Sequence, residues 1–173
     1  MNKLIIPNIV RFVLLVLAQI LFMNHLSFYG FLTPYIYVMF ILLLPLETKG
    51  WALLLFSFLI GITIDLFSGT LGLHASASVF TAFIRPLFIK LEQKPEHGSA
   101  TQPSYAEMGA RWFIPYSFLL ILIHHAFLNF METFTFSGIL HTLLRIIISS
   151  VVTFIIILSI EYIAGRNVTK KQF

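Results

Sequence analysis

The chain contains no cysteine, and only 10% of its 173 residues are charged. Without cysteine, neither disulfides nor thiolate metal sites can form. Soluble domains carry about 25% charged residues, so this composition leaves no room for a soluble domain of any size. Basic residues outnumber acidic ones, 11 to 7, but they are scattered over short stretches. That distribution gives no indication of a nucleic-acid-binding surface.

Enzyme signatures are missing as well. The sequence has no HExxH, GxSxG or Walker motif. Asp65 is the only aspartate, which excludes a pair of catalytic aspartates. His124 and His125 are adjacent, but no further ligands stand at metal-binding spacing, and histidines in membrane helices more often hydrogen-bond between helices. We therefore predict a protein without catalytic residues, cofactor or metal.

What the sequence has instead is apolar residues, which make up 58% of the chain and give a mean hydropathy of +0.93. This predicts an integral membrane protein, in which each spanning helix needs about 20 apolar residues. The second candidate span is short and bracketed by Pro34 and Pro45, so it is either an untilted span or partly re-entrant. The basic, apolar N-terminus lacks a signal-peptide cleavage site and is interpreted as a retained first span. Six spans are predicted: Pro7–Leu26, Phe31–Leu46, Trp51–Phe67, Leu73–Leu91, Trp112–Met131 and Ile139–Ala164.

The positions of Lys and Arg predict the orientation. Basic residues lie at the N-terminus, after the second span, around the polar linker 92–111 and in the tail 165–173. The loops 24–33, 68–72 and 132–137 carry none. Because cytoplasmic loops are enriched in Lys and Arg, this alternation predicts six spans with both termini in the cytoplasm. We expect one all-α transmembrane domain over residues 1–173.

The stretch Gly61–Pro86 concentrates the residues expected to specify the interior. It places Asp65 and Arg85 in apolar segments, where a charge costs about 2.5–3.5 kcal/mol. A turn with Gly69 and Gly72 separates them. At a rise of ~1.5 Å per residue, the two charges differ in depth by more than ~10 Å. We therefore do not expect them to pair with each other.

Arg145, near the outer start of the sixth span, lies at a better depth to pair with Asp65. We predict an outer polar cluster around these two charges. Arg85 is expected to extend to the inner headgroups, as is Arg11 on the first span, and pairing of Arg85 with Glu161 is the alternative. Three further polar residues can join the outer cluster: His74, His125 and Asn129.

Small residues form a face on each of the third and fourth spans. Ser57 and Gly61 are spaced by four residues, as are Ser78 and Ala82. Such pairs let helix backbones approach closely in a membrane. These faces either pack within the chain or dock the single helix of a partner, and the sequence leaves both interpretations open.

The stretch Gly61–Pro86 resembles the rod shape-determining protein MreD family. The shared pattern is a glycine, an aspartate, a glycine-rich turn, small residues and a closing Phe-x-Arg-Pro. The chain length, six spans and basic cytoplasmic ends also fit, whereas the linker 92–111 is longer than the family pattern. The matching positions are Gly61, Asp65, Gly69, Gly72, Ala75, Phe83, Arg85 and Pro86.

The resemblance implies a non-enzymatic, multi-pass protein of the bacterial inner membrane. Members of this family bind the scaffold MreC and work with the MreB filament and with RodA and its transpeptidase in lateral peptidoglycan synthesis. Their fold is similar to the membrane S components of energy-coupling-factor vitamin transporters. The alternative function is therefore a small-solute-binding component of such a transporter.

Overall fold

The computed structural model describes residues 2–25, 32–91, 101–133 and 138–169, and every regular element in these ranges is a helix. This agrees with the predicted all-α class. The four long helices after the second segment match predicted spans closely, and α4 has the predicted bounds. The elements are α1 (Asn2–Leu21), η1 (Met23–His25), α2 (Val38–Leu43), α3 (Gly50–Ser68), α4 (Leu73–Leu91), α5 (Tyr105–Met108), α6 (Ala110–Thr133) and α7 (Ile139–Thr169).

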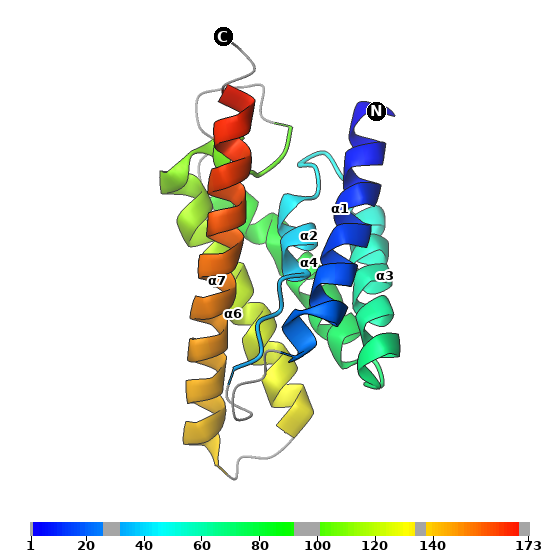
Figure 1. Ribbon diagram of the computed structural model, residues 1–173, viewed down its shortest axis with the longest axis vertical. Helices are drawn as coiled ribbons and strands as arrows, with labels where there is room; N and C mark the ends of the chain where they lie inside the picture. The colour runs from blue at the N-terminus through cyan, green and yellow to red at the C-terminus, as the bar shows by residue number, and fades with distance from the viewer. Residues whose placement is uncertain (1, 26–31, 92–100, 134–137, 170–173) are drawn as a thin grey trace.

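The helices form one elongated bundle (Figure 1). Helices α1 and α3 lie along one side, α6 and α7 along the other, and α2 and α4 between them. Helix α1 begins and α7 ends at the same end of the bundle (Figure 1). Helices α3 and α4 run in opposite directions, as do α6 and α7, whereas α1 and α3 both begin at the same end of the bundle (Figure 1).

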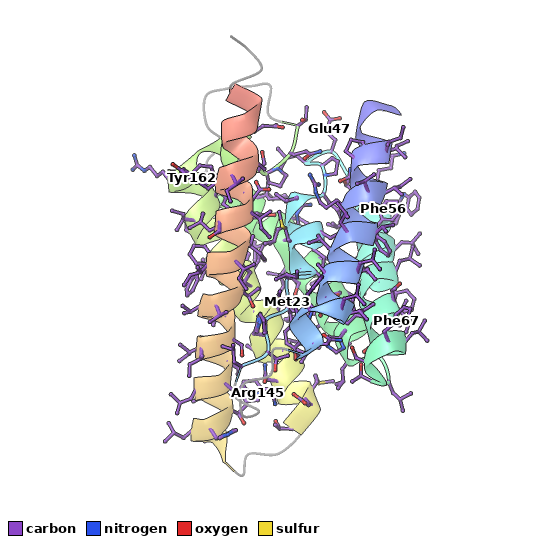
Figure 2. All side chains as sticks on the ribbon, in the orientation of Figure 1. Met23, Glu47, Phe56, Phe67, Arg145 and Tyr162 are labelled. Atoms are coloured by element: carbon purple, nitrogen blue, oxygen red, sulfur yellow. The ribbon has the colours of Figure 1, made fainter. Side chains whose placement is uncertain are left out.

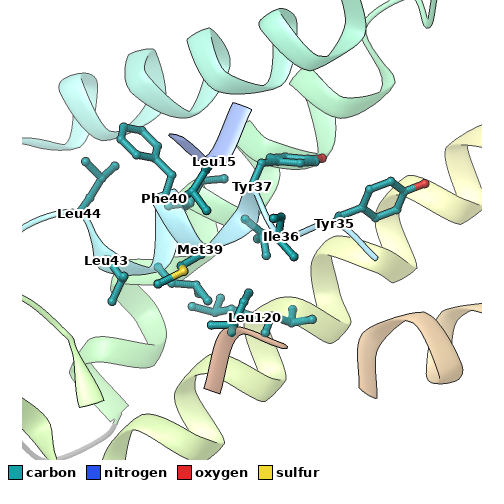
Figure 3. Close-up of a cluster of buried hydrophobic side chains, with 14 of the residues drawn as sticks. Leu15, Tyr35, Ile36, Tyr37, Met39, Phe40, Leu43, Leu44 and Leu120 are labelled. Atoms are coloured by element: carbon teal, nitrogen blue, oxygen red, sulfur yellow. The ribbon is translucent and has the colours of Figure 1, made fainter. Parts of the chain in front are cut away.

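Helix α2 is the centre of the core. All six of its residues are buried, with Val38, Ile41, Leu42 and Leu43 completely inaccessible. Side chains from α1 and α6, including Leu15 and Leu120, pack around it (Figure 3). The outer faces of α1, α3 and α7 instead carry many exposed Leu, Ile, Val and Phe side chains (Figure 2). Apolar side chains on both the inside and the outside are typical of a bundle surrounded by lipid.

Among the residues that the structure describes, three helices are long and apolar enough to cross a membrane: α3, α6 and the part Ile139–Gly165 of α7. The apolar part of α1, Ile5–Leu21, is shorter. Helix α4 has 19 residues, but its His, Ser, Thr, Arg and Lys side chains lower its hydropathy. These helices are compatible with a membrane protein, and in the described ranges three of the six predicted spans have the length and hydropathy of a membrane-crossing helix.

The second predicted span, 31–46, is not a helix of spanning length. Residues 33–35 are irregular, and the helix comprises only Val38–Leu43. The four non-helical residues 32–35 can cover at most ~13 Å, at the ~3.3 Å per residue of a fully extended chain. Residues 36–43 add ~12 Å at the helical rise of ~1.5 Å. This short segment thus reaches up to ~25 Å of the ~30 Å hydrocarbon core, about 7 Å more than twelve helical residues would.

The polar linker 92–111 is partly structured. Residues 92–100 lie outside the described part of the chain, but the following residues fold onto the end of the bundle. Glu107 accepts hydrogen bonds from the N–H groups of Thr101 (2.6 Å) and Gln102 (3.0 Å). Glu161 on α7 accepts one from the N–H of Tyr105 at 3.0 Å. The end of this linker is therefore attached to the bundle rather than being a solvated loop throughout.

Candidate functional site

The α3–α4 hairpin brings two helices into unusually close contact. Gly69 and Gly72 have φ of 68° and 81°, in the left-handed region that favours glycine, and they turn the chain between the helices. Gly61 lies against the first turn of α4, where a Cβ would come within 2.5 Å of the Ala75 Cα and 2.6 Å of the His74 oxygen. Only glycine fits this crossing without displacing backbone.

Asp65 caps the N-terminus of α4. Its Oδ1 accepts from the His74 N–H at 3.0 Å, and its Oδ2 accepts from the Ala75 N–H at 2.9 Å. Thr70 Oγ1 and His74 Nδ1 also contact Oδ1, at 2.5 and 2.9 Å. A helix N-terminus carries a partial positive charge that favours a carboxylate. This explains how an aspartate that is only 2% exposed is accommodated in an apolar helix.

The predicted pairing of Asp65 with Arg145 is wrong. Each charge has a different partner: Asp65 meets His74, and Arg145 Nη1 meets Glu132 Oε2 at 2.9 Å. Of the residues expected to join the outer cluster, His74 does contact Asp65. His125 has other partners on α6 and α7. The similar depth of Asp65 and Arg145 along their helices did not predict their pairing, because depth does not determine which helix faces which.

Arg85 does not extend to the headgroups and does not pair with Glu161. It is 2% exposed, and its guanidinium holds the C-terminal end of α2. Nε donates to the Tyr116 hydroxyl at 2.9 Å, and Nη2 donates to the carbonyl of Leu44. Tyr116 in turn donates to the carbonyl of Leu42 at 2.9 Å. A cation at a helix C-terminus stabilises the exposed carbonyls, so Arg85 fixes α2 inside the bundle.

Arg11 acts on the same end of α2 from the opposite side. Its Nη1 donates to the Leu43 carbonyl at 3.3 Å and to Asn8 Oδ1 at 2.9 Å. Its Nη2 donates to Gln102 Oε1 at 3.2 Å. This arginine therefore connects α1, α2 and the end of the linker.

Side chains from α1 and α7 satisfy the irregular backbone that precedes α2. Thr33 and Tyr35 donate their N–H groups to Ser149 Oγ (3.1 Å) and Thr153 Oγ1 (3.2 Å), one turn apart on α7. Gln19 accepts from the Ile36 N–H at 2.9 Å and donates to the Pro34 carbonyl at 3.1 Å. Non-helical backbone at membrane depth is tolerated only where protein satisfies it in this way.

Aromatic rings fill the space next to this backbone. The rings of Tyr35 and Tyr37 lie 5.1–6.2 Å, centroid to centroid, from those of three buried histidines. The tyrosine side chains are drawn in Figure 3. Most of these contacts are edge-to-face, an arrangement that stabilises aromatic pairs. The histidines of this cluster are His74, His124 and His125.

Hydrogen bonds select one tautomer for His124. Thr81 Oγ1 donates its single proton to the Ala77 carbonyl at 2.8 Å, so it accepts from His124 Nδ1 at 3.1 Å. His124 Nε2 then accepts from the Tyr37 hydroxyl at 2.7 Å. Both ring nitrogens are thus used within the fold. Among the described residues, no group of three or more His, Cys, Asp or Glu side chains is placed to hold a metal ion.

The chain matches no family model, no curated protein and no solved structure. The contacts of its own residues therefore carry the functional argument.

The small-residue faces predicted on the third and fourth spans point into the bundle. Ser57, Ser78 and Ala82 are completely buried, and Gly61 contacts α4. They pack within the chain, so a partner helix cannot dock on them. Pro86 lies on the exposed side of α4, and the helix continues past it to Leu91.

An accessible concave surface lies on the other side of the same hairpin. It is an open groove of about 510 Å³ between α3 and α4. Gly72, Ala75 and Ser76 form part of its lining, and Phe58 and Phe83, 45% and 71% exposed, contribute large apolar walls. The remaining lining residues are apolar: Leu54, Ile62, Val79 and Phe80. Such a surface suits an apolar side chain or helix rather than a polar solute.

Sequence reasoning did not identify two residues that organise the interior, Gln19 and Tyr116. Gln19 could have been found, because it is the single polar residue within the apolar run 12–23 of the first span. Tyr116 gave no comparable signal, since tyrosines are common in membrane helices near the headgroups. Its role depends on α2 and Arg85, which only the tertiary structure brings to it.

Proposed function

We propose that this chain is a non-enzymatic membrane scaffold of the bacterial cell-elongation machinery, as its resemblance to the MreD family implies. In this proposal it crosses the inner membrane six times, with both termini in the cytoplasm. It supports lateral peptidoglycan synthesis by binding the scaffold MreC, and through MreC it works with MreB, RodA and the transpeptidase.

The observation that carries the proposal is the contrast between interior and exterior. In solute transporters, broken membrane helices leave backbone groups free for substrate or ions. Here, side chains of the protein itself donate hydrogen bonds to the carbonyls of Pro34 and of Leu42 to Leu44. Other side chains accept hydrogen bonds from the N–H groups of Thr33, Tyr35 and Ile36. The accessible concavity is instead apolar and faces outward. This favours helix binding over solute binding.

The α3–α4 groove is the docking place in this proposal. A partner with one membrane helix can set large aliphatic side chains over the small residues Gly72, Ala75 and Ser76. Association in lipid depends on such close packing, because lipid tails are as apolar as the side chains themselves. The partner helix needs no charge along this stretch, since the groove presents none.

Ser76→Trp tests this by filling the groove. Ser159→Trp is the matched control, because Ser159 is an exposed serine on α7 whose hydroxyl also donates to a backbone carbonyl within its own helix. Both variants are co-expressed with a tagged MreC-type scaffold and purified. We expect Ser76→Trp to reduce the co-purified amount several-fold and Ser159→Trp to leave it unchanged. Equal recovery with both variants contradicts docking in the groove, and a co-purified ATPase complex or bound small molecule supports the transporter alternative.

A further inference from the structure

Ala75 connects the groove to the buried hairpin. Its side chain lines the groove, while its N–H donates to Asp65 Oδ2 at 2.9 Å. Its Cα faces Gly61, where an added Cβ would come within 2.5 Å. The residue is only 3% exposed. Gly72, Ala75 and Ser76 form the floor of the groove. The position of this floor therefore depends on its contact with α3 inside the protein.

The Asp65 carboxylate holds the whole first turn of α4. Within the described part of the chain, the carboxylate hydrogen-bonds with Thr70, His74 and Ala75, so these hydrogen bonds lie within the hairpin. Two other residues of this turn, Gly72 and Ser76, line the groove, and the Ser76 N–H donates to the Gly72 carbonyl at 2.9 Å. Movement of this turn must therefore move the floor.

We infer that Asp65 is a positioning residue for the α3–α4 groove: it sets the floor on which a partner helix packs. This inference rests on the proposed function. Without the carboxylate, the N–H groups of His74 and Ala75 lose their acceptors in a site that holds no bulk water. Leaving such groups unpaired is costly, so the turn unwinds or tilts toward other acceptors. The small side chains that form the groove floor are then displaced.

Two substitutions grade this effect. Asp65→Ala removes both acceptor oxygens. Asp65→Asn keeps the shape and one acceptor, but its NH2 group faces a second N–H donor and cannot accept from it. A merely structural role predicts lost stability in both variants. A positioning role predicts in addition a displaced groove floor, larger with Ala than with Asn.

The groove can be measured with spin labels, because the chain has no cysteine. Labels at Phe58→Cys and Phe83→Cys lie on α3 and α4, on opposite walls, and their separation is read by pulsed electron paramagnetic resonance in lipid nanodiscs. We expect Asp65→Ala to shift the distance by roughly 1–2 Å, about one residue's rise in a helix, or to broaden its distribution, and Asp65→Asn to do so less. Glu132→Ala, which removes a carboxylate paired on α6 and α7, is the control and should leave the distance unchanged.

Partner recovery is measured in parallel with unlabelled Asp65→Asn, using the single-helix scaffold of the proposed function. A displaced groove together with several-fold lower recovery supports the inference. An unchanged distance in both Asp65 variants overturns the positioning role, whatever the recovery. A displaced groove with full recovery shows that the scaffold binds elsewhere, so it overturns the inference that the groove floor carries the partner helix and leaves scaffold binding itself standing. Monodisperse elution of Asp65→Asn shows that the variant is folded.

Discussion

Replacing Gly61 by alanine tests the close contact between α3 and α4. The added Cβ would lie 2.5 Å from the Ala75 Cα, 2.6 Å from the His74 oxygen and 2.7 Å from the Ala75 nitrogen. Carbon atoms are in favourable contact at about 3.5–4.0 Å. The two helices must therefore separate by roughly 1 Å or more at this point. All three neighbours are backbone atoms of α4, so no side chain can rotate away to make room.

The cost combines two effects. Overpacking of this kind costs about 1–3 kcal/mol. Moving His74 and Ala75 also stretches their hydrogen bonds to Asp65, and each bond lost leaves a buried group at a cost of about 1–3 kcal/mol. The gain in helix propensity from Gly to Ala offsets about 1 kcal/mol. We expect Gly61→Ala to destabilise the fold by about 2–5 kcal/mol.

Gly50→Ala is the matched control. Gly50 is the first residue of the same helix, and an added Cβ meets nothing within 4 Å. The apparent Tm of each variant is measured in detergent by intrinsic fluorescence. A destabilisation of about 3 kcal/mol corresponds to a fall of roughly 6–12 °C for a chain of this size, and Gly50→Ala should change Tm little. Equal Tm values for the two variants would refute the close contact between α3 and α4.

Two further substitutions test the buried and the exposed charges. Arg85→Lys should lower stability by about 2 kcal/mol, because one ammonium cannot reach both the Leu44 carbonyl and the Tyr116 hydroxyl; a Tm equal to that of the parent chain would argue against a role of Arg85 at the end of α2. The pair Glu132–Arg145 is partly exposed, with side chains 40% and 19% accessible, so Glu132→Ala should cost at most about 1 kcal/mol. Exchanging the two residues should restore the parent Tm, and no recovery in the exchanged variant would show that they are not coupled.

Much of the helical framework was predictable from local properties of the sequence. Hydropathy located α3, α4, α6 and α7, because each apolar run is bounded by Gly, Pro or polar residues. The turn between α3 and α4 was also predictable, since Gly69 and Gly72 do take the positive φ values that such a turn requires. The second span was wrong as a helix, although Pro34 and Pro45 had signalled that it was irregular.

The partners of the charges were mostly not predictable. Rise per residue correctly separated Asp65 from Arg85, but it gave only depth. Several helices offer polar groups at the same depth, and the choice between them depends on how each helix is rotated and placed. Asp65 hydrogen-bonds to residues close in the sequence, at the start of the next helix, α4. Arg85 instead donates to the Leu44 carbonyl, on a segment that does not form a regular span.

Composition and periodicity alone indicated an apolar, all-helical chain, compatible with a membrane protein, and a tight hairpin within Gly61–Pro86. These properties follow from composition, periodicity and the conformational freedom of glycine, which act over a few neighbouring residues. The cap that Asp65 places on α4, and the hold of Arg85 and Arg11 on α2 at the centre of the bundle, depend on how distant helices pack together. The reason is that an irregular buried segment is stable only when side chains from distant helices satisfy its backbone. Which distant residues come close enough to do so cannot be read from the order of residues along the chain.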